Sequence, residues 1–305
     1  MRTAARVAIA FAITTLTGVL IVPNAAQAAP SGPAPAPTGP SILASWFSGT
    51  VAAGASLNQS WNNANPLNAA YVVGFSPAGA STSAACQFEV TRSWYLQRFS
   101  GEREFWFTIK NVGSIACGAN ILLGSITTAT TWPTGGMNPG ASQTTHWNNA
   151  NPLNASYVVG LSPKGATNSS TCQFEVTKTW YVQQPGGERE FRLTVKNVGA
   201  IACTADVYLA SKTTATSWPT DTLAPGISET SHWNNANPLT VAYLVGLTPS
   251  QGQLSGTPCQ FQVTRTWYLQ RINTNGSVER EFYITVKNVG ALTCSATVRL
   301  ASVNT

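Results

Sequence analysis

The residues best suited to chemistry in this chain belong to a seven-residue motif, W-N-N-A-N-P-L, that occurs three times. An indole ring offers an apolar face for stacking a sugar ring, and asparagine amides both donate and accept hydrogen bonds with hydroxyls. The motif therefore predicts three carbohydrate-binding loops. The predicted ligand-binding residues are Trp61, Asn62, Asn63, Asn65, Trp147, Asn148, Asn149, Asn151, Trp233, Asn234, Asn235 and Asn237.

A structural interpretation of the same motif stands beside this one. Each Trp would anchor a hydrophobic core, and Asn-Ala-Asn-Pro would form a turn whose amides bond their own backbone. A surface for a protein partner is a third interpretation. A structural Trp is buried and its replacement unfolds the repeat, whereas a binding Trp can be replaced with loss of the ligand alone. The sequence leaves this choice open.

Other groups capable of catalysis are few. His146 and His232 each precede a motif Trp, but the first copy has Ser60 there, so we expect half-exposed loop histidines rather than catalytic bases. Glycosidases use carboxylate pairs, and one such pair is Glu102 and Glu104. The copies are Glu188 with Glu190, and Glu279 with Glu281. An arginine separates the two carboxylates each time, so we expect solvated strand edges that discourage strand addition.

Known signatures of nucleophilic, metalloprotease or phosphate-loop enzymes do not occur in the sequence. Asp206 and Asp221 are the only aspartates, and the chain has two histidines and no C-x-x-C, which disfavours calcium and zinc sites. We therefore predict a protein that is not an enzyme and that has no cofactor and no metal.

The motif recurs at a step of 86 residues, and other landmarks keep the same step. These landmarks are Trp46, Trp132 and Trp218 before the motif, and Tyr71, Tyr157 and Tyr243 after it. A fixed period of this length indicates tandem copies of one folding unit. We predict repeats at residues 42–126, 127–212 and 213–305, with so little linker that neighbours contact one another.

The six cysteines fall into one pair per repeat. Because the repeats share this design and the chain carries an export signal described below, we predict one disulfide within each repeat. The predicted pairs are Cys86 with Cys117, Cys172 with Cys203, and Cys259 with Cys294.

The secondary-structure signal is β throughout, with Val, Thr, Tyr, Phe and Trp in the patterned stretches and Gly, Pro, Asn and Ser between them. From Cys86 onward a period-two pattern predicts a strand with Trp94 on the inner face and Tyr95 on the outer face. Arg92 interrupts the inner face, through either a β-bulge or a stem lying along a Trp. The predicted outer face carries Tyr95, Tyr181, Tyr268, Trp106, Arg192 and Tyr283, a second candidate binding surface.

The second strand of this hairpin begins near Glu102 and ends at an Asn-Val-Gly turn. Six or seven short antiparallel strands per repeat, each with one buried face, pack as two sheets. The sequence therefore predicts an all-β protein of three tandem, disulfide-stapled β-sandwich repeats. The run E-F-x-x-T-(I/V)-K-N-V-G resembles bacterial extracellular immunoglobulin-like adhesion modules of the CARDB type, which implies an immunoglobulin-like sandwich. The resemblance covers about 25 residues of each repeat and implies nothing about a ligand.

The chain opens with features of an export signal. Arg2 and Arg6 precede an apolar run and a small-residue site at Ala26-Gln27-Ala28, which predicts a signal peptide at residues 1–28. A Pro-rich linker follows at residues 29–41. We expect a secreted protein with no membrane span in the mature chain.

Charged residues make up only 9% of the chain, and the formal charge of +6 falls to +4 without Arg2 and Arg6. Scattered basic residues do not suit a nucleic-acid partner. We therefore expect a secreted multivalent protein that binds extracellular or cell-wall carbohydrate. The alternatives are an extracellular structural or protein-interaction (adhesin-like) protein, and a secreted toxin component.

Overall fold

The structure is a computed structural model that describes residues 27–28, 41–62, 64, 69–127, 130–148, 150, 154–214, 216–234, 236, 240–250 and 256–304. These residues form an all-β protein, and no helix occurs among them. Of the predicted signal peptide, only the short strand β1 (Gln27–Ala28) is described. The predicted linker lies outside the described residues except for Ser41, where β2 begins.

Each repeat contributes six strands in the same order. The first repeat has β2 (Ser41–Phe47), β3 (Ser56–Trp61), β4 (Ala69–Ala78), β5 (Cys86–Gln97), β6 (Arg103–Asn111) and β7 (Gly118–Thr127). The second has β8 (Thr130–Pro133), β9 (Ser142–Asn148), β10 (Ala155–Lys164), β11 (Cys172–Gln183), β12 (Arg189–Asn197) and β13 (Thr204–Thr213). The third has β14 (Thr216–Pro219), β15 (Ser228–Trp233), β16 (Val241–Pro249), β17 (Cys259–Ile272), β18 (Val278–Asn288) and β19 (Ala296–Asn304).

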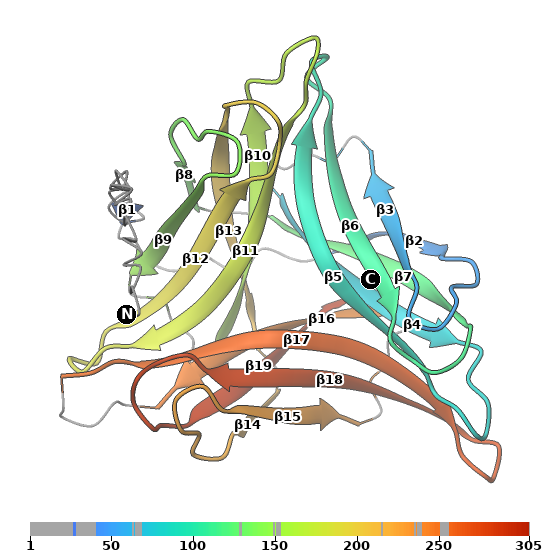
Figure 1. The fold of residues 1–305 in the computed structure, drawn as a ribbon. Coiled ribbons are helices and arrows are strands. Elements are labelled where there is room, and N and C mark those ends of the chain that lie inside the picture. The colour runs from blue at the N-terminus through green and yellow to red at the C-terminus, as the bar shows by residue number, and fades with distance from the viewer. Residues whose placement is uncertain are drawn as a thin grey trace, which may run out of the picture.

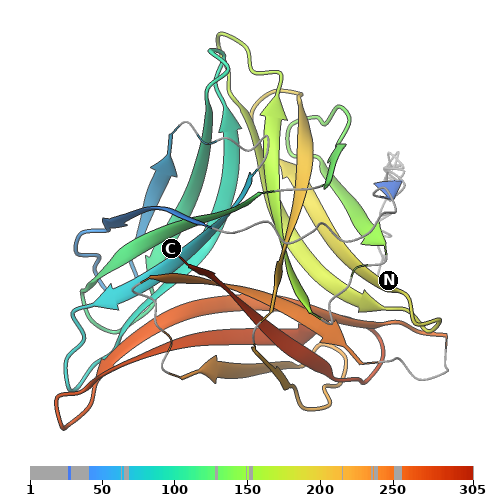
Figure 2. The same ribbon diagram turned by 180° about the vertical axis from the view of Figure 1, so that it is seen from behind.

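The strands form one large sheet and three small ones. Strands β2, β7 and β4 form a three-stranded sheet, as do β8, β13 and β10, and β14, β19 and β16. We call these the separate sheets. The other strands join in a single ten-stranded sheet, here called the shared sheet, which spans all three repeats. In Figure 1 the shared sheet outlines a triangle, with β5, β11 and β17 lining its inside and β3, β9 and β15 along its outside. In Figure 2, seen from behind, the separate sheets lie in front of it.

The triangle closes because each long strand pairs with the next one in turn. The end of β5 pairs with the start of β11, so that Gln97 lies opposite Cys172. The end of β11 pairs with the start of β17, and the end of β17 returns to the start of β5, where Gln270 lies opposite Cys86. The repeats were expected to touch, and the structure joins them by backbone hydrogen bonds into a closed ring.

The hydrophobic core of each repeat lies between its part of the shared sheet and its separate sheet. In the first repeat Phe75 of β4 packs on Phe88 of β5, and Tyr71 packs on Phe105. The predicted disulfides Cys86–Cys117, Cys172–Cys203 and Cys259–Cys294 are confirmed, and each links the two layers of one repeat. The all-β, disulfide-stapled fold is therefore as predicted.

The three separate sheets meet at the centre of the ring through glycines. Gly74, Gly160 and Gly246 each follow the Tyr-Val-Val or Tyr-Leu-Val of their repeat, and each lies against a strand of another repeat. A Cβ built on Gly160 would lie 2.8 Å from the carbonyl oxygen of Ala69, closer than such atoms can approach. Small apolar residues, including Ala70 and Ala242, fill the contact around these glycines. We call the contact around Gly74, Gly160 and Gly246 the glycine seam. Only glycine fits there, because a Cβ would lie too close to the neighbouring strand.

The strand pattern predicted for the hairpin is wrong in its second half. A register shift between Val90 and Arg92 inserts one residue into β5, and the same shift occurs in β11 and β17. This is the β-bulge that was one of the two interpretations of Arg92. Because one extra residue reverses the alternation of side chains, Tyr95 points into the core and Trp94 lies on the outer face.

Candidate functional site

The motif tryptophans lie at the edge of each repeat, between its part of the shared sheet and its separate sheet. Trp61, Trp147 and Trp233 sit at or near the ends of β3, β9 and β15, which border the shared sheet on the outside of the triangle. Each stacks on a second Trp from the border of the separate sheet. The pairs are Trp46 with Trp61, Trp132 with Trp147, and Trp218 with Trp233, with ring centroids 6.4, 6.4 and 6.2 Å apart.

The three pairs differ in how much solvent they meet. The side chain of Trp147 is 1% exposed, Trp61 is half-buried, and Trp233 is 37% exposed. β9 also carries β1 as a parallel neighbour on its outer side, but β1 belongs to the predicted signal peptide and would be absent from the chain that begins at residue 29. Strands β3 and β15 have no further strand beyond them in the described residues. The same motif therefore seals the core in the second repeat and presents an aromatic face in the third.

The exposed pair forms part of a cleft of about 830 Å³ in the third repeat. It is lined by Thr216, Ser217, Trp218, Thr230, Ser231, His232, Trp233 and Asn234. The indole Nε1 of Trp218 donates to Ser231 Oγ at 3.0 Å, which fixes the ring at the wall of the cleft. By contrast, the space beside Trp132 in the second repeat leaves no room for a water molecule. The third repeat thus holds a candidate site, which we call the edge cleft.

The motif asparagines are described only in part. Asn62 and Asn234 are exposed and Asn148 is half-buried. The predicted residues Asn63, Asn65, Asn149, Asn151, Asn235 and Asn237 lie outside the described residues. The alanine between them is buried in every copy, which anchors the loop to the core. The edge cleft therefore brings together Trp233 and Asn234 of the predicted set.

The sequence analysis missed several residues of the edge cleft. Trp218 was recognised only as a landmark of the repeat, and Ser217, Thr230 and Ser231 were not considered. The signal that could have found Trp218 was its constant distance of 15 residues before the motif Trp. The hydroxyl residues carry no such signal, because alternate exposed strand positions are often Ser or Thr.

The two histidines lie on strands rather than in loops. His232 is exposed on β15 and stacks on Tyr283, with ring centroids 5.1 Å apart. Tyr283 in turn stacks on Trp267, and the guanidinium of Arg265 lies 4.6 Å from the Trp267 ring. His146 is half-buried at the equivalent place on β9, beside Arg192 of β12. His232 thus ends an aromatic ladder that runs across the shared sheet to the border of the edge cleft.

The second candidate surface, on the outer face of the hairpin, is corrected by the bulge. Tyr95, Tyr181 and Tyr268 are buried, and their hydroxyls accept hydrogen bonds from the backbone N–H of Tyr71, Tyr157 and Tyr243. Burial raises the pKa of these tyrosines. Trp106, Arg192 and Tyr283 remain on the outer face as predicted. These tyrosines therefore have a structural role in the core and are not available to a ligand.

The expectation of solvated glutamates is wrong for one member of each pair. Glu104, Glu190 and Glu281 are buried. Glu190 accepts hydrogen bonds from Gln184 Nε2 at 2.8 Å and Arg192 Nε at 2.6 Å. The corresponding donors are Arg98 and Trp106 for Glu104, and Arg271 and Tyr283 for Glu281. Donors on both oxygens hold these carboxylates in fixed places, which suits a structural role better than proton transfer.

The same contacts shift several pKa values. Burial and the hydrogen bond to Glu281 raise the pKa of Tyr283 to about 12. For Glu190, desolvation acts to raise the pKa, but the hydrogen bonds from Arg192 and Gln184 outweigh it and the net pKa is lowered. Among the described residues, no group of three or more His, Cys, Asp and Glu side chains is placed to hold a metal ion.

Comparison of the chain with protein-family models, with curated proteins and with solved structures finds no match. In the part of the chain that the structure describes, no helix is long and apolar enough to cross a membrane.

Proposed function

We propose that this protein is a secreted, multivalent binding protein that recognises extracellular or cell-wall carbohydrate. The observation that carries the proposal is the edge cleft of the third repeat. It combines two stacked indole rings, one of them 37% exposed, with the hydroxyls of Ser217, Thr230 and Ser231 and the amide of Asn234. A saccharide needs an apolar surface for its ring face and donors and acceptors for its hydroxyls, and this cleft supplies both.

The closed ring favours binding to more than one ligand at a time. The strands β3, β9 and β15 that carry the motif lie on three different sides of the triangle (Figure 1). Sites on the sides of the first and third repeats would contact separate polysaccharide chains or distant points on one surface, and linked sites raise avidity without new contacts. The edge of the first repeat, with Trp61 half-buried, is the next candidate.

Secretion belongs to the same proposal. It rests on the signal peptide expected at residues 1–28 and on the three disulfides, which persist in oxidising compartments. Neither an enzymatic activity nor a cofactor is part of the proposal. The rival function is an extracellular structural or protein-interaction protein, and the full burial of Trp147 favours it for the second repeat.

The test is binding of soluble oligosaccharides to the chain from residue 29 onward, measured by glycan array and then by titration calorimetry. We expect Trp233→Ala to lower the affinity at least about tenfold, or about 1.4 kcal/mol, while the circular dichroism spectrum is retained. Trp147→Ala should instead cost about 3–5 kcal/mol of folding free energy, because that ring is buried.

The matched control is Ile227→Ala, which removes an exposed apolar side chain of the same repeat outside the cleft. It should change neither binding nor folding. If no glycan is retained by the protein, the carbohydrate proposal fails and the structural role takes its place. If Trp233→Ala binds as well as the parent, the edge cleft is not the binding site.

A further inference from the structure

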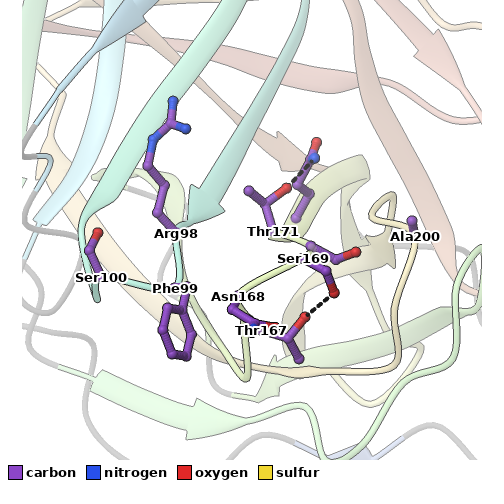
Figure 3. A pocket seen from close by; sticks show the side chains of 10 residues that line it. Arg98, Phe99, Ser100, Thr167, Asn168, Ser169, Thr171 and Ala200 are labelled. Carbon is purple, nitrogen blue, oxygen red and sulfur yellow. Dashed lines mark hydrogen bonds between the residues drawn. The ribbon is translucent and has the colours of Figure 1, made fainter.

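Two corners of the ring carry open polar clefts that no repeat could form alone. The first, of about 530 Å³, lies between the hairpin tip at Arg98 to Ser100 in the first repeat and the loop from Thr167 to Thr171 in the second (Figure 3). The second, of about 630 Å³, lies between the hairpin tip at Arg271 to Asn275 in the third repeat and the loop from Ser81 to Ala85 in the first. We call these the corner clefts.

Ring closure builds both corners in the same way. In one corner the side-chain oxygen of Gln97 accepts hydrogen bonds from the backbone N–H of Gly165 at 3.0 Å and of Ala166 at 3.3 Å. In the other, the side-chain oxygen of Gln270 accepts one from Ala80 N–H at 3.2 Å. Each glutamine thus holds the loop of the neighbouring repeat against its own hairpin. The corner clefts are consequences of the closed ring.

The loops present hydroxyl groups held in defined positions. Thr167 and Ser170 are joined by two backbone hydrogen bonds of 2.9 and 3.2 Å, and the hydroxyls of Thr167 and Ser169 lie 3.3 Å apart. The loop of the first repeat repeats this arrangement, with the hydroxyls of Ser81 and Ser83 3.2 Å apart. Paired hydroxyls on a fixed turn can each donate and accept, which suits a ligand rich in hydroxyls.

An apolar side chain also lines each cleft. Phe99 at the hairpin tip is 68% exposed and offers an apolar ring face to solvent. In Figure 3 its ring lies beside Asn168 and Thr167. Ile272 has the corresponding place in the other corner. Each corner therefore combines an apolar face with a polar loop.

The charges at each corner decide the class of ligand. Arg98 is paired with Glu104 and lies 4.0 Å from Glu102. In the other corner Arg271 pairs with Glu279 and Glu281. Arg103 stands between the two carboxylates of the first corner and Arg280 between those of the second. Each corner therefore carries two guanidiniums and two carboxylates, with no net charge to attract an acidic ligand.

We propose that the two corner clefts bind an uncharged saccharide, as a class of site separate from the edge cleft. The ligand class of this proposal rests on the proposed function. Its location rests on residues that are not part of the edge cleft. The third corner is not included, because its hairpin has Gln184 and Pro185 where Arg98 and Phe99 stand, and residues 251–255 of the facing loop lie outside the described residues.

The experiment follows backbone amide shifts of the complete chain from residue 29 onward by NMR. The probes are cellohexaose, chitohexaose, xylohexaose and laminarihexaose, with hexagalacturonate as the acidic counter-probe. We expect at least one neutral probe to shift amides in residues 167–171 and 81–85 during titration, and hexagalacturonate to shift neither loop.

Two corner variants test the residues. Phe99→Ala and the double change Asn168→Ala with Ser169→Ala should each weaken binding at the first corner at least tenfold, while the second corner still titrates. Pro185→Ala, at the tip of the remaining hairpin, is the matched control and should change nothing.

Trp233→Ala separates this proposal from that for the edge cleft. If it abolishes all binding and the corner amides never shift, the corner proposal is overturned and the edge cleft stands. If the corners titrate normally in Trp233→Ala and no site is lost, the edge cleft falls and the corners stand. If no neutral probe shifts the corner amides in the parent, the corner proposal is wrong.

Discussion

At the scale of single residues, one position is repeated three times with different partners. The buried glutamate of each hairpin receives two donors, but the donors change from arginine and tryptophan to glutamine and arginine, and then to arginine and tyrosine. What persists is a carboxylate with both oxygens satisfied. A buried charge is tolerated only when it is paired or hydrogen-bonded. Each repeat therefore supplies two donors to the carboxylate, although the residues that donate differ.

The lowered pKa of Glu190 gives a prediction about acid stability. A carboxyl whose pKa is lower in the folded state stabilises the protein above its unfolded pKa, and this contribution disappears as the pH falls through the folded value. We expect Glu190→Gln to melt at a lower temperature than the parent at pH 6, and the gap to narrow as the pH falls below the ordinary pKa of about 4.5. Thermal melts across this pH range measure it.

The control for this prediction is Glu188→Gln, which makes the same charge change at an exposed side chain two residues away. It should melt with the parent at every pH. A gap between Glu190→Gln and the parent that stays constant as the pH falls below about 4.5 would show that folding does not lower the pKa of Glu190.

At the scale of the elements, the bulge and the glycine seam fix how strands meet. The bulge places a cation over an outward Trp in each repeat, with Arg92, Lys178 and Arg265 lying 4.8, 4.7 and 4.6 Å from the rings of Trp94, Trp180 and Trp267. Arg92 also pairs with Glu175 of the next repeat, and Arg265 with Glu89. In β17 the matching position is Gln262, so Lys178 has no carboxylate there. The bulge therefore places cationic side chains where they can form ion pairs between neighbouring repeats.

The glycine seam gives a prediction about packing. Gly160→Val would place side-chain atoms where the backbone of Ala69 already lies, so strands β4 and β10 would have to separate. We expect a loss of at least about 3 kcal/mol, at the upper end of overpacking effects because the obstacle is backbone. Chemical denaturation measures it. Gly186→Ala, where an added Cβ meets nothing within 4 Å, is the control and should unfold with the parent.

At the scale of the whole molecule, closure makes the three repeats one structure. Each repeat shares its longest strand with both neighbours, through β5, β11 and β17. A repeat cut out of the ring would expose these strand ends and the apolar surface at the glycine seam. The usual picture of tandem sandwiches as independent beads therefore does not hold here.

Closure gives a prediction about cooperativity. We expect the chain from residue 29 onward to unfold in a single calorimetric transition, with the calorimetric enthalpy equal to the van't Hoff enthalpy. The isolated segment 127–212 should lack a cooperative transition, because its pairings with β5 and β17 are gone. Three separate transitions, or a stably folded 127–212, would show that the repeats are independent.

Several features of the protein follow from the sequence alone. Local patterns in the sequence predict the 86-residue period, the strands of the hairpin and the cysteine pairing. These predictions hold because each repeat folds the same local pattern in the same way. Trp233 and Asn234 of the candidate site could also be predicted from the sequence, because an aromatic residue beside amides is a recognisable chemical pattern.

The tertiary structure decided what depends on neighbours distant in sequence. One inserted residue in β5 reverses the side-chain alternation, so Tyr95 exchanges faces with Trp94, and a period-two rule has no means of detecting it. The burial of Glu190 depends on donors placed by the folded hairpin. The ring, its corner clefts and the unequal exposure of Trp147 and Trp233 arise from contacts between nearly identical repeats. Local patterns repeat with the sequence, whereas closure is a property of how the copies pack.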